Sequence, residues 1–145
     1  MEWQSTLSKL FPDARFPRGA TLGQITSCEH LLGIKLPSDL KGLLIESDGI
    51  LVDYGIGLVW PIARIEADNL TFRCNPDFQG LYMPFDSLLF FGEAGNGDQF
   101  AFSIQSGAVR RSDIFGWSHG DDSRTWIAPS LKTFFQWWAS GHVKI

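Results

Sequence analysis

The fold is decided by the stretch Leu88-Leu-Phe-Phe-Gly-Glu-Ala-Gly-Asn-Gly-Asp-Gln-Phe-Ala-Phe102. Four apolar residues run into Gly92, and on the far side Phe100 and Phe102 alternate with smaller or polar residues, a period of two that is typical of a half-buried strand. The glycines, Asn and Asp between these two runs tolerate positive φ or bond their own backbone, so they allow a tight reversal. The stretch therefore predicts a central β-hairpin.

A glycine-rich loop can also bind phosphate, so the loop has to be compared with known phosphate-binding patterns. A dinucleotide fingerprint opens a helix, and a P-loop contains a Lys followed by Ser or Thr. Here a strand pattern follows Gly97, the loop has no Lys, and the carboxylates of Glu93 and Asp98 would repel a phosphate. We interpret the loop as a structural turn or, alternatively, as a surface whose acidic groups bind a partner.

Length and charge limit the function classes. A chain of 145 residues suits one domain, 1–145, that buries enough surface for a core without disulfides. The net charge of -4 disfavours a nucleic-acid binder and favours a basic partner. The first residues lack the positive charge of a leader peptide, and no stretch approaches the roughly 20 apolar residues of a membrane span. We therefore expect a cytoplasmic protein without membrane association. Cys28 and Cys74 are expected to be reduced and packed.

Periodicity outside the hairpin predicts helices at both ends of the chain. Thr21 and Gln24 have capping-box spacing before apolar residues at helical intervals that end at Gly33. Ser38 is expected to cap a second helix, and Ser130 a last helix that ends at Gly141. Two short strands are expected in 50–60, a loop in 69–80, and an exposed loop in 116–124. The prediction is an α+β single domain, with an antiparallel sheet of about five to six strands packed by N-terminal helices and a C-terminal helix.

Several short motifs resemble one known family. They are Leu32-Gly33-x-x-Leu36-Pro37, Asp48-Gly49, Phe91-Gly92 followed by Gly97-Asp98-x-Phe100, and Ile127-Ala128-x-Ser130-Leu131-x-x-Phe134. Their order and spacing are similar to those of the SUKH superfamily, the Smi and Knr type of domain, from about Thr21 to Ala139. Asp48 stands where the family more often has Asn, and Phe100 where Tyr is common.

This resemblance implies a protein-binding function. It implies an immunity protein of a bacterial polymorphic or contact-dependent toxin system, which neutralises a cognate toxin, often a nuclease, by direct docking. A related role in the family, regulation of fungal cell-wall synthesis, is also protein binding. The alternative function is a small-ligand-binding or hydrolytic domain with a cleft beside the glycine-rich hairpin.

Catalytic and metal sites have little support in the sequence. Ser118, His119 and the following acids suggest a triad, but adjacent Ser and His side chains rarely face each other at hydrogen-bond distance. His30 and His142 lack the spacing of metal ligands. We therefore expect no catalytic residue, no metal and no cofactor.

Acidic and aromatic residues in predicted turns are the candidate docking residues. Acids favour fast association with a basic toxin, and aromatic side chains are enriched at binding hot spots. Trp60 and Trp117 are flanked by turn residues or acids, so exposure in an interface is kept for them as an alternative to burial in the core. The candidate partner-binding residues are Asp48, Trp60, Glu93, Asp98, Trp117, Asp121 and Asp122.

Overall fold

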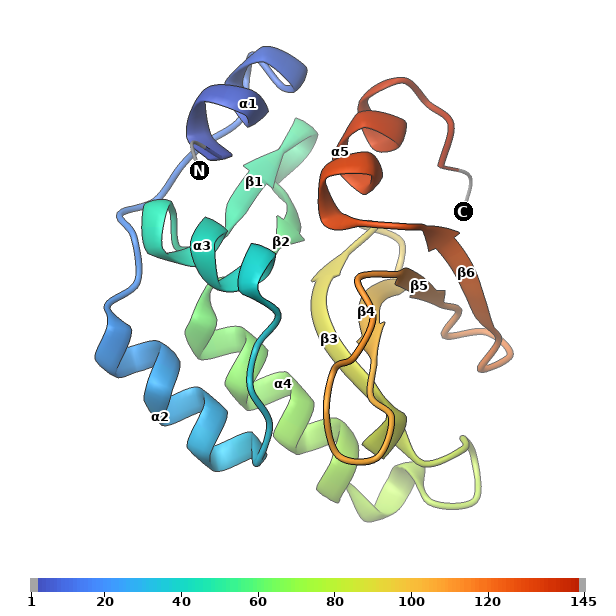
Figure 1. The fold of residues 1–145 in the computed structure, drawn as a ribbon. Coiled ribbons are helices and arrows are strands. Elements are labelled where there is room, and N and C mark those ends of the chain that lie inside the picture. Colours follow the sequence, from blue (N-terminus) through green and yellow to red (C-terminus); the bar gives the residue numbers. More distant parts are fainter. Residues whose placement is uncertain (1–2, 144–145) are drawn as a thin grey trace.

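The computed structural model describes residues 3–143, which form an α+β domain (Figure 1). The helices are α1 (Trp3–Leu10), α2 (Leu22–Leu32), α3 (Ser38–Glu46), α4 (Ile62–Cys74) and α5 (Leu131–Ala139). The strands are β1 (Ile50–Val52), β2 (Ile56–Val59), β3 (Leu88–Glu93), β4 (Gln99–Ser103), β5 (Ile114–Trp117) and β6 (Arg124–Ala128). Short 3-10 turns, η1 (Asp53–Gly55), η2 (Pro76–Phe78) and η3 (Phe85–Ser87), complete the described elements.

The predicted central hairpin is confirmed as β3 and β4. These strands pair antiparallel, with Leu89 opposite Phe102 and Glu93 opposite Gln99. They form one side of a four-stranded antiparallel sheet of order β3-β4-β5-β6. The glycine-rich turn joins these two largely buried strands and so allows β3 and β4 to pair.

The six strands divide into two sheets, whereas the sequence predicted one. β1 and β2 form a separate antiparallel pair that crosses β3, where Trp60 N donates to Phe91 O at 2.8 Å. At the crossing, a Cβ on Gly92 would lie only 1.9 Å from the carbonyl oxygen of Leu58. Only glycine allows this close approach, so Gly92 lets the β1–β2 pair lie directly against β3 of the four-stranded sheet.

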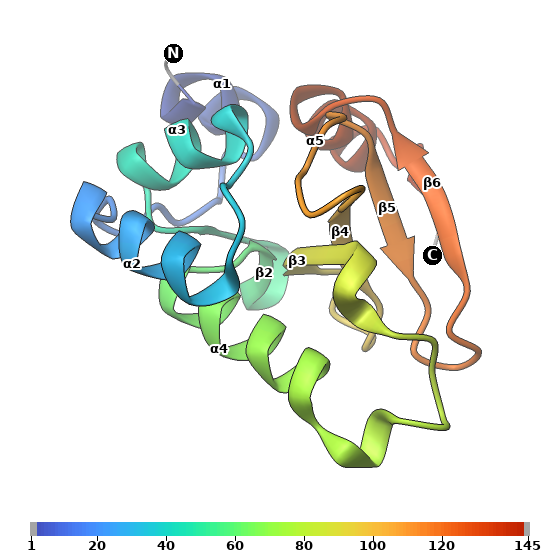
Figure 2. The same cartoon turned by 60° about the horizontal axis from the view of Figure 1, so that its bottom comes forward.

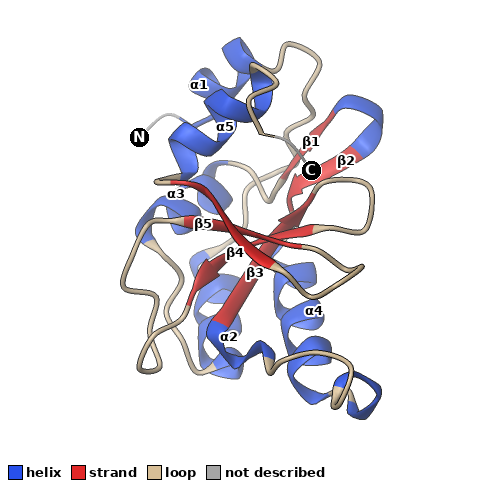
Figure 3. Ribbon diagram, turned by 90° about the vertical axis from the view of Figure 1, so that its right-hand side faces the viewer, coloured by secondary structure: helices blue, strands red, loops and turns tan. Residues whose placement is uncertain are grey.

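The core lies on both faces of the four-stranded sheet. On one face Phe91 and Phe100 pack against Phe134 of α5, with ring centroids 6.0 and 4.7 Å apart. On the other face Phe90 packs against Phe72 of α4 at 5.0 Å. Figure 3 shows the strands in the middle of the molecule, with α2 and α4 on one side and α1 and α5 on the other.

The helix signals read from the sequence are largely confirmed. Thr21 and Gln24 form both bonds of the capping box, at 3.1 and 2.9 Å, and Gly33 ends α2 with a φ of 67°. Ser130 caps α5 through Thr133 N. Ser38 does not act as a cap, because α3 begins at Ser38 itself and the preceding Pro37 makes no side-chain cap bond.

One predicted loop contains regular structure instead. The predicted loop 69–80 begins inside α4, because the buried Asn69 side chain bonds Ile65 O at 2.7 Å and both backbone groups of Phe90 at 2.9 Å. The predicted exposed loop 116–124 is confirmed as the turn 118–123 between β5 and β6, with its two ends inside the strands. The contacts of Asn69 with Phe90 of β3 stabilise the second half of α4 beyond its local propensity.

The cysteines are free, but they differ in environment. Cys28 is buried, and Cys74 is exposed, so the expectation that both are packed is wrong for Cys74. Burial first, then the charges of Glu66 and Glu29, raises the pKa of the Cys28 thiol to about 12. Within residues 3–143, no helix combines the length and hydrophobicity needed to cross a bilayer.

Candidate docking surface

Two turns at the same end of the four-stranded sheet lie side by side. Asp98, in the turn between β3 and β4, contacts His119 Nδ1 at 2.8 Å and accepts a hydrogen bond from His119 N at 3.2 Å. Gly97 has a φ of 99°, and a Cβ there would lie 2.8 Å from the imidazole ring. The fold thus brings Asp98 to the turn that carries Asp121 and Asp122.

Asp122 is a structural residue that holds this turn to the rest of the domain. Its Oδ1 accepts from Trp117 Nε1 at 2.6 Å and from Arg124 Nη2 at 3.1 Å, and its Oδ2 accepts from Met83 N at 2.8 Å. Burial raises the pKa of Asp122, but these hydrogen bonds outweigh it and hold the pKa below its ordinary value. The carboxylate is therefore ionised and already engaged at neutral pH.

The expectation that Trp117 is exposed is wrong. Its ring is buried in an aromatic cluster between the sheet and α4, where centroid distances to its neighbours are 5.4 to 5.8 Å. The neighbouring rings are Phe72, Tyr82, Phe85 and Phe90. Edge-to-face packing of this kind stabilises a core, so Trp117 is a core residue beneath the turn that carries Asp121 and Asp122.

Asp121 differs from its neighbour because its side chain is exposed to solvent. The Ser123 hydroxyl first, and then the Ser123 N–H, which donates to Asp121 Oδ1 at 3.0 Å, hold the pKa of Asp121 below its ordinary value. Among the described residues, no cation forms a salt bridge with it. Asp121 therefore presents a free negative charge at this end of the sheet.

Trp60 and Glu93 lie at the amino end of α4 and are joined by Arg64. The Arg64 guanidinium lies 4.3 Å from the Trp60 ring centroid and bonds both Glu93 oxygens at 3.2 Å. Burial lowers the pKa of Arg64, but its bonds to Glu93 and Asp68 outweigh burial and raise it. Trp60 is fully buried, so its predicted exposure is also wrong.

Asp48 belongs to the same end of α4. Its Oδ1 accepts a hydrogen bond from Ile62 N at 2.7 Å, which satisfies one of the free N–H groups at the start of the helix. Asp48 is only half-buried, but its carboxylate stabilises the positive end of the helix dipole. The five predicted acids thus form two groups, one at the start of α4 and one at the turns of the sheet.

The Ser118 and His119 pair is not arranged as a nucleophile and base. His119 Nδ1 contacts Asp98 from the other turn, and no hydrogen bond joins Ser118 to the His119 ring within the described part of the chain. No three His, Cys, Asp or Glu side chains among residues 3–143 gather closely enough to hold a metal ion.

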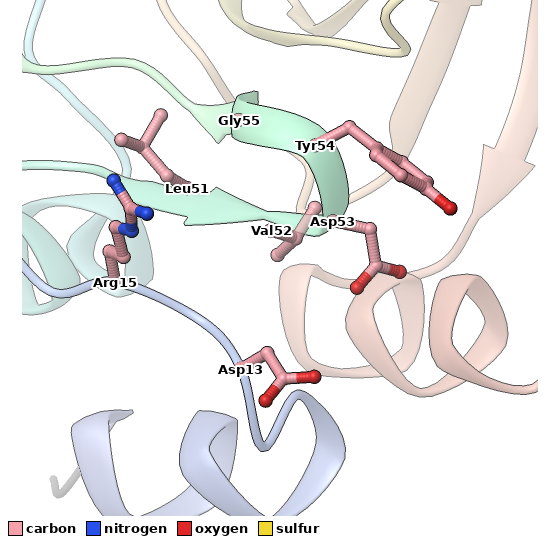
Figure 4. Close-up of a pocket in the computed structure, with 7 residues that line it drawn as sticks. All are labelled: Asp13, Arg15, Leu51, Val52, Asp53, Tyr54 and Gly55. Atoms are coloured by element: carbon pink, nitrogen blue, oxygen red, sulfur yellow. The ribbon is translucent and has the colours of Figure 1, made fainter.

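An open cavity of about 770 Å³ lies beside the β1–β2 hairpin (Figure 4). The carboxylates of Asp13 and Asp53 point into the same space, and the fully exposed Tyr54 ring extends away from it. Tyr54 adopts a φ of 62° at the tip of the hairpin. The lining also contains Arg15, and it includes no Ser, Thr or Cys nucleophile and no His base, so a serine- or cysteine-type hydrolytic pair is absent from this cavity.

The sequence-based selection missed several exposed apolar side chains. Leu81 and Met83 precede β3, and Trp126 lies on β6 with its Nε1 bonded to Asp113 at 2.7 Å. Single apolar residues in a sequence carry no signal of exposure, whereas turn acids do, so only the fold could identify them.

The comparisons with known proteins agree with the motifs in the sequence. A family model, SUKH_6, described as SMI1-KNR4 cell-wall, matches residues 22–135. No curated protein shows a significant match to the chain. The matched range runs from the start of α2 into α5 and includes the glycine-rich hairpin.

Proposed function

The chain belongs to the SUKH superfamily, and on that premise we propose that it is a non-enzymatic protein-binding module, an immunity protein that neutralises a cognate bacterial toxin by direct docking. The family match over residues 22–135 carries this proposal, since an immunity-type binding role is consistent with it. In this role the protein acts in the cytoplasm and needs no cofactor.

The charge of the surface supports a basic partner. The chain has a net charge of -4, and Asp121 is exposed and ionised beside the turn that contains Asp98. Toxins that act on nucleic acids need cationic surfaces to contact phosphate. An acidic inhibitor gains a faster encounter with such a toxin through electrostatic steering, and it can block the active site without chemistry of its own.

The competing function is a small-ligand-binding or hydrolytic domain. It was expected to use a cleft beside the glycine-rich hairpin, whereas the open cavity in Figure 4 lies at the β1–β2 hairpin. The lining of that cavity has no Ser, Thr or Cys nucleophile and no His base, so it gives a hydrolytic pair of that type no support. Direct docking by surface charge requires no such cavity, and we favour it for that reason.

Co-expression tests the proposal. The protein encoded by the gene directly upstream is induced in a sensitive bacterial host with or without this chain, and the chain should restore growth and bind the purified toxin. Failure both to protect and to bind would refute the immunity function. Turnover of a substrate by the purified chain alone would favour the competing function.

A charge variant tests the docking surface. Asp121→Lys should slow association several-fold at low salt and weaken its salt dependence, because it reverses an exposed charge that steers encounter. Asp39→Lys is the matched control, since Asp39 is also exposed but lies on the first turn of α3. Equal association rates for the two variants would remove Asp121 from the interface.

A further inference from the structure

The connection between α4 and β3 carries an apolar surface that has no role in the charge-based docking proposed above. Leu81 and Met83 in this connection are 71% and 58% exposed. Between them and α4 lies a cavity of about 370 Å³, called here the α4–β3 pocket. Four aromatic residues, Phe72, Phe78, Tyr82 and Phe85, line it together with Met83, Pro84 and the polar residues Arg73, Asn75, Gln79 and Asp86. Its volume is in the range of sites that take up a side chain or a small molecule.

The α4–β3 pocket is held in place by the turn that carries Asp122. Arg124 donates to Met83 O at 2.9 Å and to Pro84 O at 3.0 Å, and Asp122 accepts from Met83 N. Figure 2 shows the connection passing beside the turn between β5 and β6. A partner would therefore meet a pocket that is already formed, and binding would cost little ordering entropy.

The aromatic lining of the pocket is equally fixed. Phe72 packs against Phe78 and Phe85 with centroid distances of 5.2 and 5.1 Å. Tyr82 lies 5.5 Å from Phe78 and 5.7 Å from Phe85. The rings form a continuous apolar wall, which suits an aliphatic or aromatic side chain from outside.

The charges that face solvent around the pocket are negative. Asp77 in η2, Asp86 in η3 and Asp121 in the adjoining turn are exposed. Two arginines lie nearby and donate to backbone carbonyls, and Arg73, whose Nε has no partner among the described residues, also lines the pocket. Arg73 bonds the carbonyls of Leu32 and Leu88 at 3.3 Å, and Arg124 bonds those of the connection. The pocket thus combines an aromatic wall with a rim whose exposed charges are acidic.

We infer that the α4–β3 pocket is the anchor site for the toxin, which inserts an apolar side chain carried on a basic surface. This inference rests on the proposed function. An apolar centre with a charged rim is the arrangement of binding hot spots. Leu81 extends the apolar area beyond the pocket lining, which favours a protein surface over a small ligand that would fill the cavity alone.

Serine substitutions at the rim of the pocket test the inference. Leu81→Ser and the double variant with Met83→Ser should weaken binding to the toxin encoded upstream by about tenfold or more, measured as Kd by biolayer interferometry. Leu22→Ser is the matched control, because Leu22 is 61% exposed on α2, and it should change Kd less than twofold. Thermal unfolding of each variant checks that the fold is retained.

The outcomes separate this inference from the function on which it rests. If the wild-type chain protects cells and binds toxin while Leu81→Ser and Leu22→Ser both bind with wild-type affinity, the anchor site is wrong and the immunity function stands. If the wild-type chain neither protects nor binds, both are wrong. A loss of affinity confined to the pocket variants, with unchanged melting temperatures, supports the anchor site.

Discussion

Replacing Asp122 by Ala is expected to destabilise the fold, because this carboxylate joins three segments. It accepts hydrogen bonds from Trp117 Nε1 at 2.6 Å, from Met83 N at 2.8 Å, and from Arg124 at 3.1 and 3.3 Å. The side chains of Arg124 and Asp122 are only 13% and 12% exposed. The Ala variant leaves Trp117 Nε1, Met83 N and Arg124 Nε without an acceptor inside the protein, whereas Arg124 Nη2 keeps its bond to Met83 O.

The size of the effect follows from these contacts. Removing one partner of a buried ion pair costs about 3–5 kcal/mol, and a buried donor without a partner costs about 1–3 kcal/mol. The two costs overlap, and solvent at the edge of the core screens part of the interaction. We therefore expect Asp122→Ala to lower the free energy of unfolding by about 2–4 kcal/mol, a large part of the roughly 5–15 kcal/mol of a typical domain.

Urea denaturation at neutral pH measures this loss. Asp122→Asn keeps an acceptor oxygen and suits the φ of 60° at this position, so it should lose less stability than the Ala variant. Asp121→Ala is the neighbouring control, whose exposed side chain should leave the denaturation midpoint close to that of the wild type. A loss below about 1 kcal/mol for Asp122→Ala would refute the structural role, given the penalties for unpaired buried donors.

The same carboxylate predicts a pH dependence. The folded-state pKa of Asp122 lies below its ordinary value of 3.8, so folding favours the ionised form. Its contribution to stability is therefore present above about pH 4 and is lost as the pH falls through the lowered folded-state pKa. The stability difference between wild type and Asp122→Ala should shrink on acidification in this window, and a constant difference would contradict the assignment.

Three further perturbations test separate parts of the structure. Glu93→Gln should cost at most about 1 kcal/mol by calorimetry, because its arginine partner is substantially exposed, and a loss of several kcal/mol would contradict this. Gly92→Ala should strongly lower the melting temperature measured by circular dichroism, since its Cβ would lie 1.9 Å from Leu58 O, and an unchanged melting temperature would rule out the close crossing of β2 and β3. A thiol reagent at pH 8 should modify the exposed Cys74 in the native chain and reach Cys28 only after denaturation, because burial raises the pKa of Cys28 to about 12, whereas rapid reaction of both thiols would show that Cys28 is accessible.

The candidate site could be predicted from the sequence only in part. Asp98, Asp121 and Asp122 lie in the turns between strands, and Asp121 is exposed, whereas Glu93 is the last residue of β3. The roles of Glu93 and Asp122 were not predictable, because Arg64 lies 29 residues from Glu93 and Met83 lies 39 residues from Asp122. Distant partners of this kind leave no trace in local spacing.

The sequence by itself determined the features that depend on neighbours along the chain. The capping box at Thr21, the reversal at Gly95 and Gly97, and the alternation of Phe100 and Phe102 all arise from contacts within a few residues or from the period of a strand. The same local motifs also indicated the SUKH superfamily, which the match over residues 22–135 confirms.

Only the tertiary structure decided which surfaces remain outside. Trp60 and Trp117 resemble interface residues in the sequence but are buried by Arg64 and by an aromatic cluster, whereas Leu81 resembles a core residue and is exposed. Burial depends on which distant segments cover a side chain, and the crossing of β2 over β3 and the path of the α4–β3 connection set that coverage. The partition of apolar residues between core and surface is therefore a property of the assembled chain.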